Sequence, residues 1–304
     1  SHTDLDGYGC QLIAKKIYPD GYYYNANYGL EVKSNIDVIL QKIKEYPDTD
    51  IFFLISDLNL TVDESRSLNK NINYLNNNGY KIKLQLLDHH KTGEKSALKY
   101  DWYYLDTSRC ATKIVFDYFM ENYEEFNSLC SDEFKTLIEA INDVDIWHDN
   151  DPYFEFGKVA MRLISSANEI NATLFPNENR AYRLSLLEKT LPFIHKENGH
   201  IELDDAIHTL KKEYLQLNDT NDTIDNLMSK HLVHLLEDKK DELTIYYKEF
   251  KGLLTFTLSN ISIPANTFLK ENSDYDFFVN IGRRGSAGFR ADGNIDVAQL
   301  ASKL

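Results

Sequence analysis

The stretch Lys81-Ile-Lys-Leu-Gln-Leu-Leu-Asp-His-His90 places three side chains of metal-ligand type directly after a predicted buried strand over 81–87. An earlier run, Ile51-Phe-Phe-Leu-Ile55, is continuously apolar, as expected for a strand buried on both faces of a parallel sheet. Asp57 follows that run by two residues. Because ligands of doubly wound α/β sheets bind just beyond the carboxyl ends of the strands, we expect the side chains after these two strands to share one site.

Helix-like segments alternate with these strands. Apolar residues recur at helical spacing over 36–43, and Thr61-x-x-Glu64 is typical of a capping box that opens a helix. The other elements that we predict in this part are helices over 108–123 and 131–141 and a short aromatic strand over 22–24. Repeated strand–helix units predict an α/β fold with a doubly wound, mainly parallel sheet.

A smaller α/β domain is predicted at the C-terminal side. Residues 201–241 are polar with a helical pattern, and strand-like runs begin near residue 242. We therefore expect a first domain over 1–200, a helical connector over 201–241 and a small second domain over 242–304. The elements predicted in the small domain are strands over 243–247, 253–258 and 277–281 and helices over 264–269 and from 295.

Bulk composition restricts the class of protein. The chain has 304 residues, 42% of them hydrophobic and 27% charged, which is typical of a soluble globular protein. The formal net charge of −15 argues against a protein that coats long duplex nucleic acid, which needs many Lys and Arg contacts to phosphate. The sequence has no apolar run of 18 residues and only three cysteines, without a C-x-x-C pair, so we expect a cytoplasmic protein with no membrane partner.

Four patterns of histidine and aspartate carry the candidate chemistry. They are His2-Thr-Asp-Leu-Asp-Gly7, Asp57, Asp88-His-His90 and Asp143-Val-Asp145. Each pattern alone is commonplace, because an aspartate after a strand is usually a cap or a turn residue. Their joint occurrence at or next to successive strand ends is harder to attribute to chance. Imidazole and carboxylate together suit Mn²⁺, Co²⁺ or Zn²⁺, and two such ions can activate a water and stabilise a phosphoryl group.

These patterns, in this order, resemble the four motifs of the DHH phosphoesterase superfamily. Within it the sequence is most similar to the bacterial NrnB-type nano-RNases. The similarity extends over Ser1–Cys10, Ser56-Asp57, Asp88–Thr92, Ser108–Thr112 and Val144-Asp-Ile-Trp147. It spans almost the whole chain, and the joint set of motifs is specific.

The resemblance implies a centre of two divalent ions, with Mn²⁺ expected first and Co²⁺ or Mg²⁺ as alternatives. The implied ligands are His2 and Asp4 for one ion, Asp6 and His89 for the other, Asp57 shared between them, and Asp145 completing the shell. Asp143 competes with Asp145 for the fourth motif. Asp145 is preferred because the family's acid precedes the tryptophan, here Trp147, by two residues.

Further catalytic and substrate-binding roles are implied for other residues. Asp88 and His90 are expected to orient His89 and, through His90, to meet a phosphate oxygen. Lys91 and Arg109 lie next to motif positions and would add positive charge, although solvated surface cations are an equally good interpretation. Segment 280–290 is similar to the arginine-bearing strand of the DHHA1 domain, which implies that Arg284 and Arg290 bind substrate.

The glycine-rich loop of DHHA1 domains is absent because the chain ends first, so we expect the small domain to be incomplete at its C-terminal side. We expect both ends to be trimmed, because no apolar strand precedes the His2 pattern and the chain stops within the last predicted helix. The implied activity is exonuclease-like hydrolysis of short oligonucleotides, with possible action on 3′-phosphoadenosine 5′-phosphate. Alternatives are a phosphohydrolase of cyclic dinucleotides or polyphosphate, and a nucleotide-sensing module without turnover. The expected partner is a short oligonucleotide or nucleotide, and a homodimer is left open.

Overall fold

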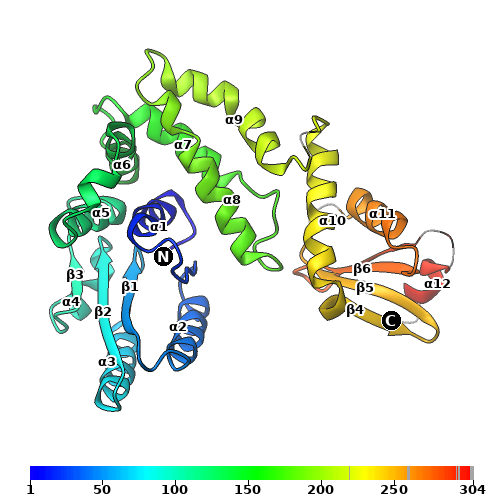
Figure 1. Ribbon diagram of the computed structural model, residues 1–304, viewed down its shortest axis with the longest axis horizontal. Helices are drawn as coiled ribbons and strands as arrows, with labels where there is room; N and C mark the ends of the chain where they lie inside the picture. Colours follow the sequence, from blue (N-terminus) through cyan, green and yellow to red (C-terminus); the bar gives the residue numbers. More distant parts are fainter. Residues whose placement is uncertain (219, 259–260, 292, 294, 302–304) are drawn as a thin grey trace. The chain divides into compact units, whose positions relative to one another are not determined.

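The computed structural model describes residues 1–218, 220–258, 261–291, 293 and 295–301. The chain forms two compact units (Figure 1). The first unit comprises Ser1–Ser165 and Leu187–Asp205, and the second comprises Ser166–Leu186 and Ala206–Leu304. Among the residues described, no helix has both the length and the apolar character needed to cross a lipid bilayer.

The first unit contains a three-stranded parallel sheet. Its strands are β1 (Asp50–Ser56), β2 (Lys81–Asp88) and β3 (Tyr103–Leu105), in the order β1-β2-β3. The first two strands were predicted, whereas β3 has only three residues and was missed. The strand predicted over 22–24 is wrong. In place of a strand partner, the carbonyl of Tyr24 accepts hydrogen bonds from the Ser1 ammonium at 3.0 Å and from Nε2 of Gln11 at 3.1 Å.

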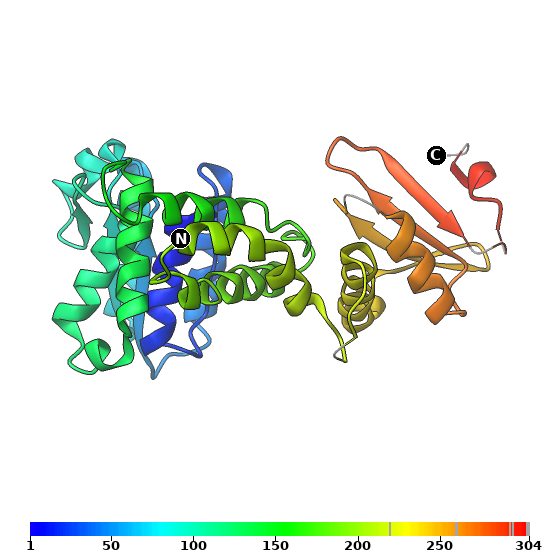
Figure 2. The same ribbon diagram turned by 90° about the horizontal axis from the view of Figure 1, so that it is seen from above.

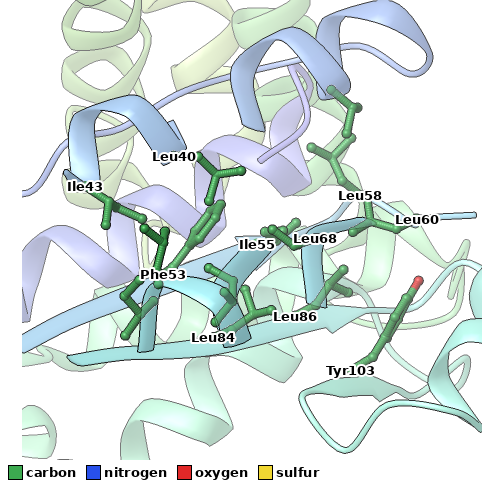
Figure 3. Close-up of a cluster of buried hydrophobic side chains, with 14 of the residues drawn as sticks. Leu40, Ile43, Phe53, Ile55, Leu58, Leu60, Leu68, Leu84, Leu86 and Tyr103 are labelled. Carbon is green, nitrogen blue, oxygen red and sulfur yellow. The ribbon is translucent and has the colours of Figure 1, made fainter. Parts of the chain in front are cut away.

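One face of this sheet packs into a hydrophobic core. Alternate residues of β1 and β2 point to this face and pack against helices α2 (Leu30–Ile43) and α3 (Val62–Asn77), as expected from the period of two in a strand (Figure 3). The capping box predicted for α3 is present, since the Thr61 side chain accepts from the backbone N–H of Glu64 and the Glu64 carboxylate accepts from that of Thr61. Among the buried core residues are Leu40, Phe53, Ile55, Leu68, Ile72, Leu84 and Leu86.

Helices also cover the opposite face. Helices α1 (Leu5–Ile17) and α5 (Ala111–Asn122) pack against each other (Figure 1). The ring of Tyr118 on α5 stacks on Phe52 of β1 with centroids 6.1 Å apart. The parallel sheet therefore has helices on both faces, as the alternation of strands and helices predicted. The remaining helices that lie wholly in this unit are α4 (Glu94–Ala97), α6 (Asp132–Asp145) and α7 (Phe154–Ser165), with short 3₁₀ turns at Lys91–Gly93, Phe126–Leu129 and Leu191–Phe193.

The second unit is built on a mixed four-stranded sheet. Its strands are β4 (Thr244–Tyr247), β5 (Phe250–Phe256), β6 (Phe277–Ile281) and β7 (Ala287–Ala291), in sequence order. Strands β5 and β6 are parallel and the two outer pairs are antiparallel. Helices α10 (Ile224–Leu243) and α11 (Ser262–Glu271) pack against each other and against this sheet (Figure 2).

Three further helices complete the described chain. Helix α8 (Pro176–Glu188) contributes residues to both units, α9 (Gly199–Leu215) begins in the first unit and continues into the second, and α12 (Val297–Ala301) lies near the end of the chain. Helices α9 and α10 occupy most of the segment that was predicted as a helical connector. The fold class is thus mixed α/β, with one parallel sheet and one mixed sheet.

Candidate metal centre

The first ligand pattern forms a loop that opens helix α1. Asp4 is the N-cap of α1, and its Oδ1 accepts from the backbone N–H of Gly7 at 3.0 Å. Its Oδ2 lies 2.5 Å from Nδ1 of His2. A Cβ atom at position 7 would lie 2.3 Å from the carbonyl oxygen of His2, so only glycine allows the loop to fold back so closely on the helix.

Asp6 lies in the first turn of α1 and is held by the N-terminus of a second helix. Its side chain is buried, and its two carboxylate oxygens accept from the backbone N–H groups of Ala111 at 2.9 Å and Thr112 at 2.6 Å. The hydroxyl of Thr112 also donates to the carbonyl oxygen of Asp6. The first N–H groups of a helix lack partners within the helix and favour negative charge, so α5 fixes this carboxylate in place.

Asp57 and His89 follow the carboxyl ends of the neighbouring parallel strands β1 and β2, as predicted. Asp57 has a left-handed backbone with φ of +55°, and its N–H donates to the carbonyl of Leu87 at 3.1 Å. Nε2 of His89 lies 3.6 Å from a carboxylate oxygen of each of Asp6, Asp57 and Asp145. The imidazole is thus surrounded by three carboxylates.

The fourth pattern contributes Asp145, which lies beside His89 at the end of a helix. Asp145 is the last residue of α6, and the His2 pattern opens α1, so two of the four patterns lie at helix ends rather than at strand ends. Asp143 lies apart, in a group with His148 and Asp151.

Two groups of ligand atoms together contain all six predicted ligands. The atoms of each group lie within 4.8 Å of one another. The groups are His2, Asp4 and Asp57, and Asp6, His89 and Asp145. Asp57 connects them, because it also groups with His89 and His90. We call these six residues the metal centre.

The carboxylates of this centre have the properties of cation ligands. Oδ2 of Asp57 and Oδ2 of Asp145 are buried without a hydrogen-bond partner in the described structure. Burying an unsatisfied carboxylate oxygen is costly, and a bound cation would remove that cost. Burial and the nearby Asp6 and Asp4 raise the pKa of Asp145 to about 8, and the same causes raise the pKa of Asp57 well above its usual range. The donor set therefore fits divalent ions.

Asp88 and His90 form a second layer beside these ligands. The buried Asp88 carboxylate accepts from the hydroxyl of Tyr103 at 3.0 Å and lies 2.7 Å from Nδ1 of His90. The side chain that Asp88 holds is thus His90, and this hydrogen bond raises the pKa of His90. Burial lowers the pKa of His89, which favours the neutral imidazole that binds metals.

The predicted cations are placed differently from one another. Lys91 is exposed at the 3₁₀ turn after His90. The guanidinium of Arg109 forms ion pairs with Asp106 at 2.7 Å and with Asp117, so a phosphate would have to compete with two carboxylates for it.

The two arginines predicted in the small domain belong to the second unit. Arg284 is exposed in the turn between β6 and β7. Arg290 is exposed on β7 and donates to Oγ of Ser262 at 2.8 Å. Their roles in substrate binding stay predictions.

Two features of the centre were missed at the sequence level. One is the pair of N–H groups at the start of α5, where Cys110 is the N-cap because its sulfur accepts from the N–H of Lys113. Cysteine is a rare cap, so the usual signal for a helix start was absent. The other is Tyr28, whose hydroxyl lies 3.1 Å from Nε2 of His90 although nothing in its sequence surroundings indicates a site.

Comparison with known proteins points to enzymes that cleave phosphodiesters. The chain is 39% identical over 301 residues to a Helicobacter pylori protein named 3′,5′-cyclic-nucleotide phosphodiesterase, covering 99% of this chain and 86% of that protein. It is 29% identical over 153 residues to oligoribonuclease NrnB of Bacillus subtilis, covering 48% of this chain and 36% of that protein. No protein-family model matches the sequence.

A solved structure shows the same fold. The crystal structure of an uncharacterized protein from Helicobacter pylori G27 matches with a TM-score of 0.90 and 39% identity, covering 99% of this chain and 87% of that one. The chain is therefore a hydrolase of the phosphoesterase class and belongs to the family of the Helicobacter pylori 3′,5′-cyclic-nucleotide phosphodiesterase.

Proposed function

We propose that this protein is a DHH-type phosphodiesterase that uses two divalent ions, Mn²⁺ first among them, to hydrolyse nucleotide phosphodiesters. The observation that carries the proposal is Asp57, a buried carboxylate that joins the group of His2 and Asp4 to that of Asp6, His89 and Asp145. A shared carboxylate with separate ligands on either side is the arrangement that a dinuclear centre requires.

The first substrate class that we propose is the 3′,5′-cyclic mononucleotides. The similarity to the Helicobacter pylori phosphodiesterase extends over nearly the whole chain, and this supports the choice. Short oligonucleotides are the second candidate, supported by the similarity to NrnB over about half of the chain and by the Asp88–Thr92 stretch that resembles the nano-RNases. Both substrates present a phosphodiester with a nucleoside on at least one side.

The chemistry follows from what the side chains can hold. Bound divalent ions lower the pKa of a coordinated water and offset the negative charge of the phosphate. Two backbone N–H groups bind the two carboxylate oxygens of Asp6 and fix the orientation of this carboxylate. In the reaction the oxygen of water bonds to phosphorus, one P–O ester bond breaks, and the leaving oxygen takes a proton.

His90 is the side chain placed to hold a proton beside the ligands. Its Nδ1 is bonded to the buried Asp88, so Nε2, which lies 3.1 Å from the Tyr28 hydroxyl, is the ring atom that can turn to a substrate oxygen when that contact is exchanged. The hydrogen bond to Asp88 fixes the direction of the ring and favours the protonated form of His90. We propose that Asp88 and His90 act together as the pair that delivers the proton to the leaving oxygen.

The second unit is the proposed substrate-binding domain of the DHHA1 type. Strand β7 carries Arg290, and the preceding turn carries Arg284, both with exposed side chains. A guanidinium group can bind a phosphate with two parallel hydrogen bonds, which supports a role for these arginines in binding a nucleotide phosphate. Lys91, exposed next to His90, is the cation of the first unit that we expect to meet the substrate.

The test is a substrate panel with purified protein and Mn²⁺, with products separated by chromatography. The panel contains cyclic AMP, cyclic GMP, dinucleotides to pentanucleotides, 3′-phosphoadenosine 5′-phosphate, a cyclic dinucleotide and polyphosphate. We expect turnover of a cyclic mononucleotide or a short oligonucleotide that EDTA abolishes. Asp57→Ala should be inactive, and Asp63→Ala, which removes an exposed carboxylate on α3, should retain full activity. Failure on every nucleotide, or activity confined to polyphosphate, would reject the proposal.

A further inference from the structure

An exposed tyrosine lies at the edge of the metal centre without an assigned role. We infer that Tyr28 binds the substrate directly, donating a hydrogen bond from its hydroxyl to an oxygen of the phosphate that is being cleaved. The inference rests on the proposed phosphodiesterase function and adds a substrate-contacting residue to it.

The segment before Tyr28 is hydrogen-bonded to the loop that contains His2 and Asp4. Nδ2 of Asn25 donates to the carbonyl of His2 at 2.8 Å, and the N–H of Ala26 donates to the carbonyl of Ser1 at 3.0 Å. The hydroxyl of Thr3, which lies between His2 and Asp4 in sequence, donates to Oδ1 of Asn27 at 2.8 Å. The backbone before Tyr28 therefore has a fixed position relative to the ligands.

The ring of Tyr28 lies beside two imidazoles of the site. Its centroid is 5.3 Å from that of His2 and 5.8 Å from that of His90, with an edge-on arrangement toward His90. Yet the side chain is 45% exposed. Contact with residues on either side of the centre, combined with this exposure, is the placement expected of a group that a bound substrate covers.

The hydroxyl is held at the end of a chain of hydrogen bonds. Tyr103 donates to Asp88, Asp88 holds Nδ1 of His90, and Nε2 of His90 lies 3.1 Å from the Tyr28 hydroxyl. A phenol has a single O–H donor, and the proton of Tyr28 can point either to Nε2 of His90 or to another acceptor beside it. Rotation about the C–O bond directs the proton to a phosphate oxygen without moving the ring.

The experiment compares Tyr28→Phe, which keeps the ring and removes the hydroxyl, with the wild-type protein. The matched control is Tyr22→Phe, an exposed tyrosine whose hydroxyl bonds to Tyr46 instead. We expect kcat/KM of Tyr28→Phe to fall at least about 10-fold, the effect of losing a hydrogen bond to a charged group. The control should stay within about 2-fold, and Mn²⁺ affinity and Tm should be unchanged in both variants.

Binding of AMP in the presence of Mn²⁺, measured by calorimetry, supplies a second readout that needs no turnover. We expect Tyr28→Phe to weaken AMP binding by a similar factor. Wild-type kcat/KM together with wild-type AMP affinity in this variant would overturn the inference. So would a loss of Mn²⁺ affinity as large as the loss of activity, because Tyr28 would then act by supporting the ligands.

The two proposals fail in different ways. If the wild-type protein hydrolyses its substrate and Asp57→Ala does not, while Tyr28→Phe is fully active, the assignment of Tyr28 alone is wrong. If the wild-type protein hydrolyses no nucleotide, the proposed function fails, and the AMP titration still decides whether Tyr28 contacts a phosphate.

Discussion

Two groups of histidine and aspartate in the first unit have the same ligand types at similar spacing but differ in their surroundings. The metal centre includes Asp6 and Asp57, each 1% exposed, with a buried oxygen of Asp57 that lacks a hydrogen-bond partner. The other group joins the buried Asp143 to His148 and Asp151, whose side chains are 54% and 49% exposed, with Nδ1 of His148 3.5 Å from Oδ2 of Asp151.

This difference shows that histidine and aspartate side chains lying close together do not by themselves make a metal site. An exposed carboxylate is satisfied by water, whereas a buried oxygen without a partner raises the free energy of the folded protein until a cation binds. The like charge around Asp57 and Asp145 adds to that cost, as their raised pKa values indicate. Substitutions in the two groups should therefore have effects of very different size.

The largest effect is expected from Asp57→Ala. It removes the carboxylate that connects the two ligand groups, so we expect kcat/KM to fall by at least about 10³-fold, the upper range for loss of one electrostatic group in an active site. Circular dichroism should show a folded protein. A loss of similar size in His148→Ala would remove the distinction between the groups.

His2→Ala should separate the two ion positions. The substitution leaves Asp6, His89 and Asp145 intact, so we expect calorimetric titration with Mn²⁺ to report one ion per chain in place of two. Activity should fall about 10²-fold, because one ion alone stabilises the phosphate less well. Two ions per chain at wild-type affinity would show that the His2 group does not bind metal.

A pH series should reveal the repulsion among the carboxylates. The pKa of Asp145 is raised to about 8 in the folded protein from a usual value of 3.8, so its burial is tolerated at low pH and becomes destabilising as pH rises toward 8. The Tm of the metal-free protein should therefore decrease between pH 5 and pH 9. Saturating Mn²⁺ should reverse this decrease, and Asp145→Asn in EDTA should flatten it. A Tm that increases over the same range in EDTA would contradict the assignment.

The smallest effect is expected from His148→Ala and Asp151→Asn. Both residues are exposed, and removing a contact between two exposed side chains changes the free energy of unfolding by about 0.5 kcal/mol or less. We expect kcat/KM within about 2-fold of wild type and an unchanged Mn²⁺ stoichiometry. A clear loss of one ion in either variant would make this group a third metal site.

Much of the centre could be predicted because its signals are local. The apolar run of β1 and the alternating apolar residues of β2 identify two strands, and parallel strands bring the residues after them, Asp57 and His89, to one edge. The capping box of α3 is likewise contained within four residues. Each of these features depends on neighbours in the sequence.

The features that were missed depend on distant partners. The segment 22–24 is rich in tyrosine, as strands often are, yet its backbone bonds to Ser1 and Gln11 rather than to a strand. The N–H groups that hold Asp6 come from residues more than a hundred positions away. Tyr28 contacts His90, which lies 62 positions away in the sequence, and no periodic pattern predicts such a contact.

Two of the cysteines provide a way to follow motion beneath the metal centre. Cys10 lies on α1 and Cys110 caps α5, and both thiols are fully buried with pKa values raised by burial. Because both thiols are buried, a thiol reagent reacts with them when the protein around them opens, so the labelling rate measures that opening without any substrate. Ions bound above these helices should slow the labelling. Mass spectrometry can therefore follow this opening from the rate at which Cys10 and Cys110 are labelled, without an assay of turnover.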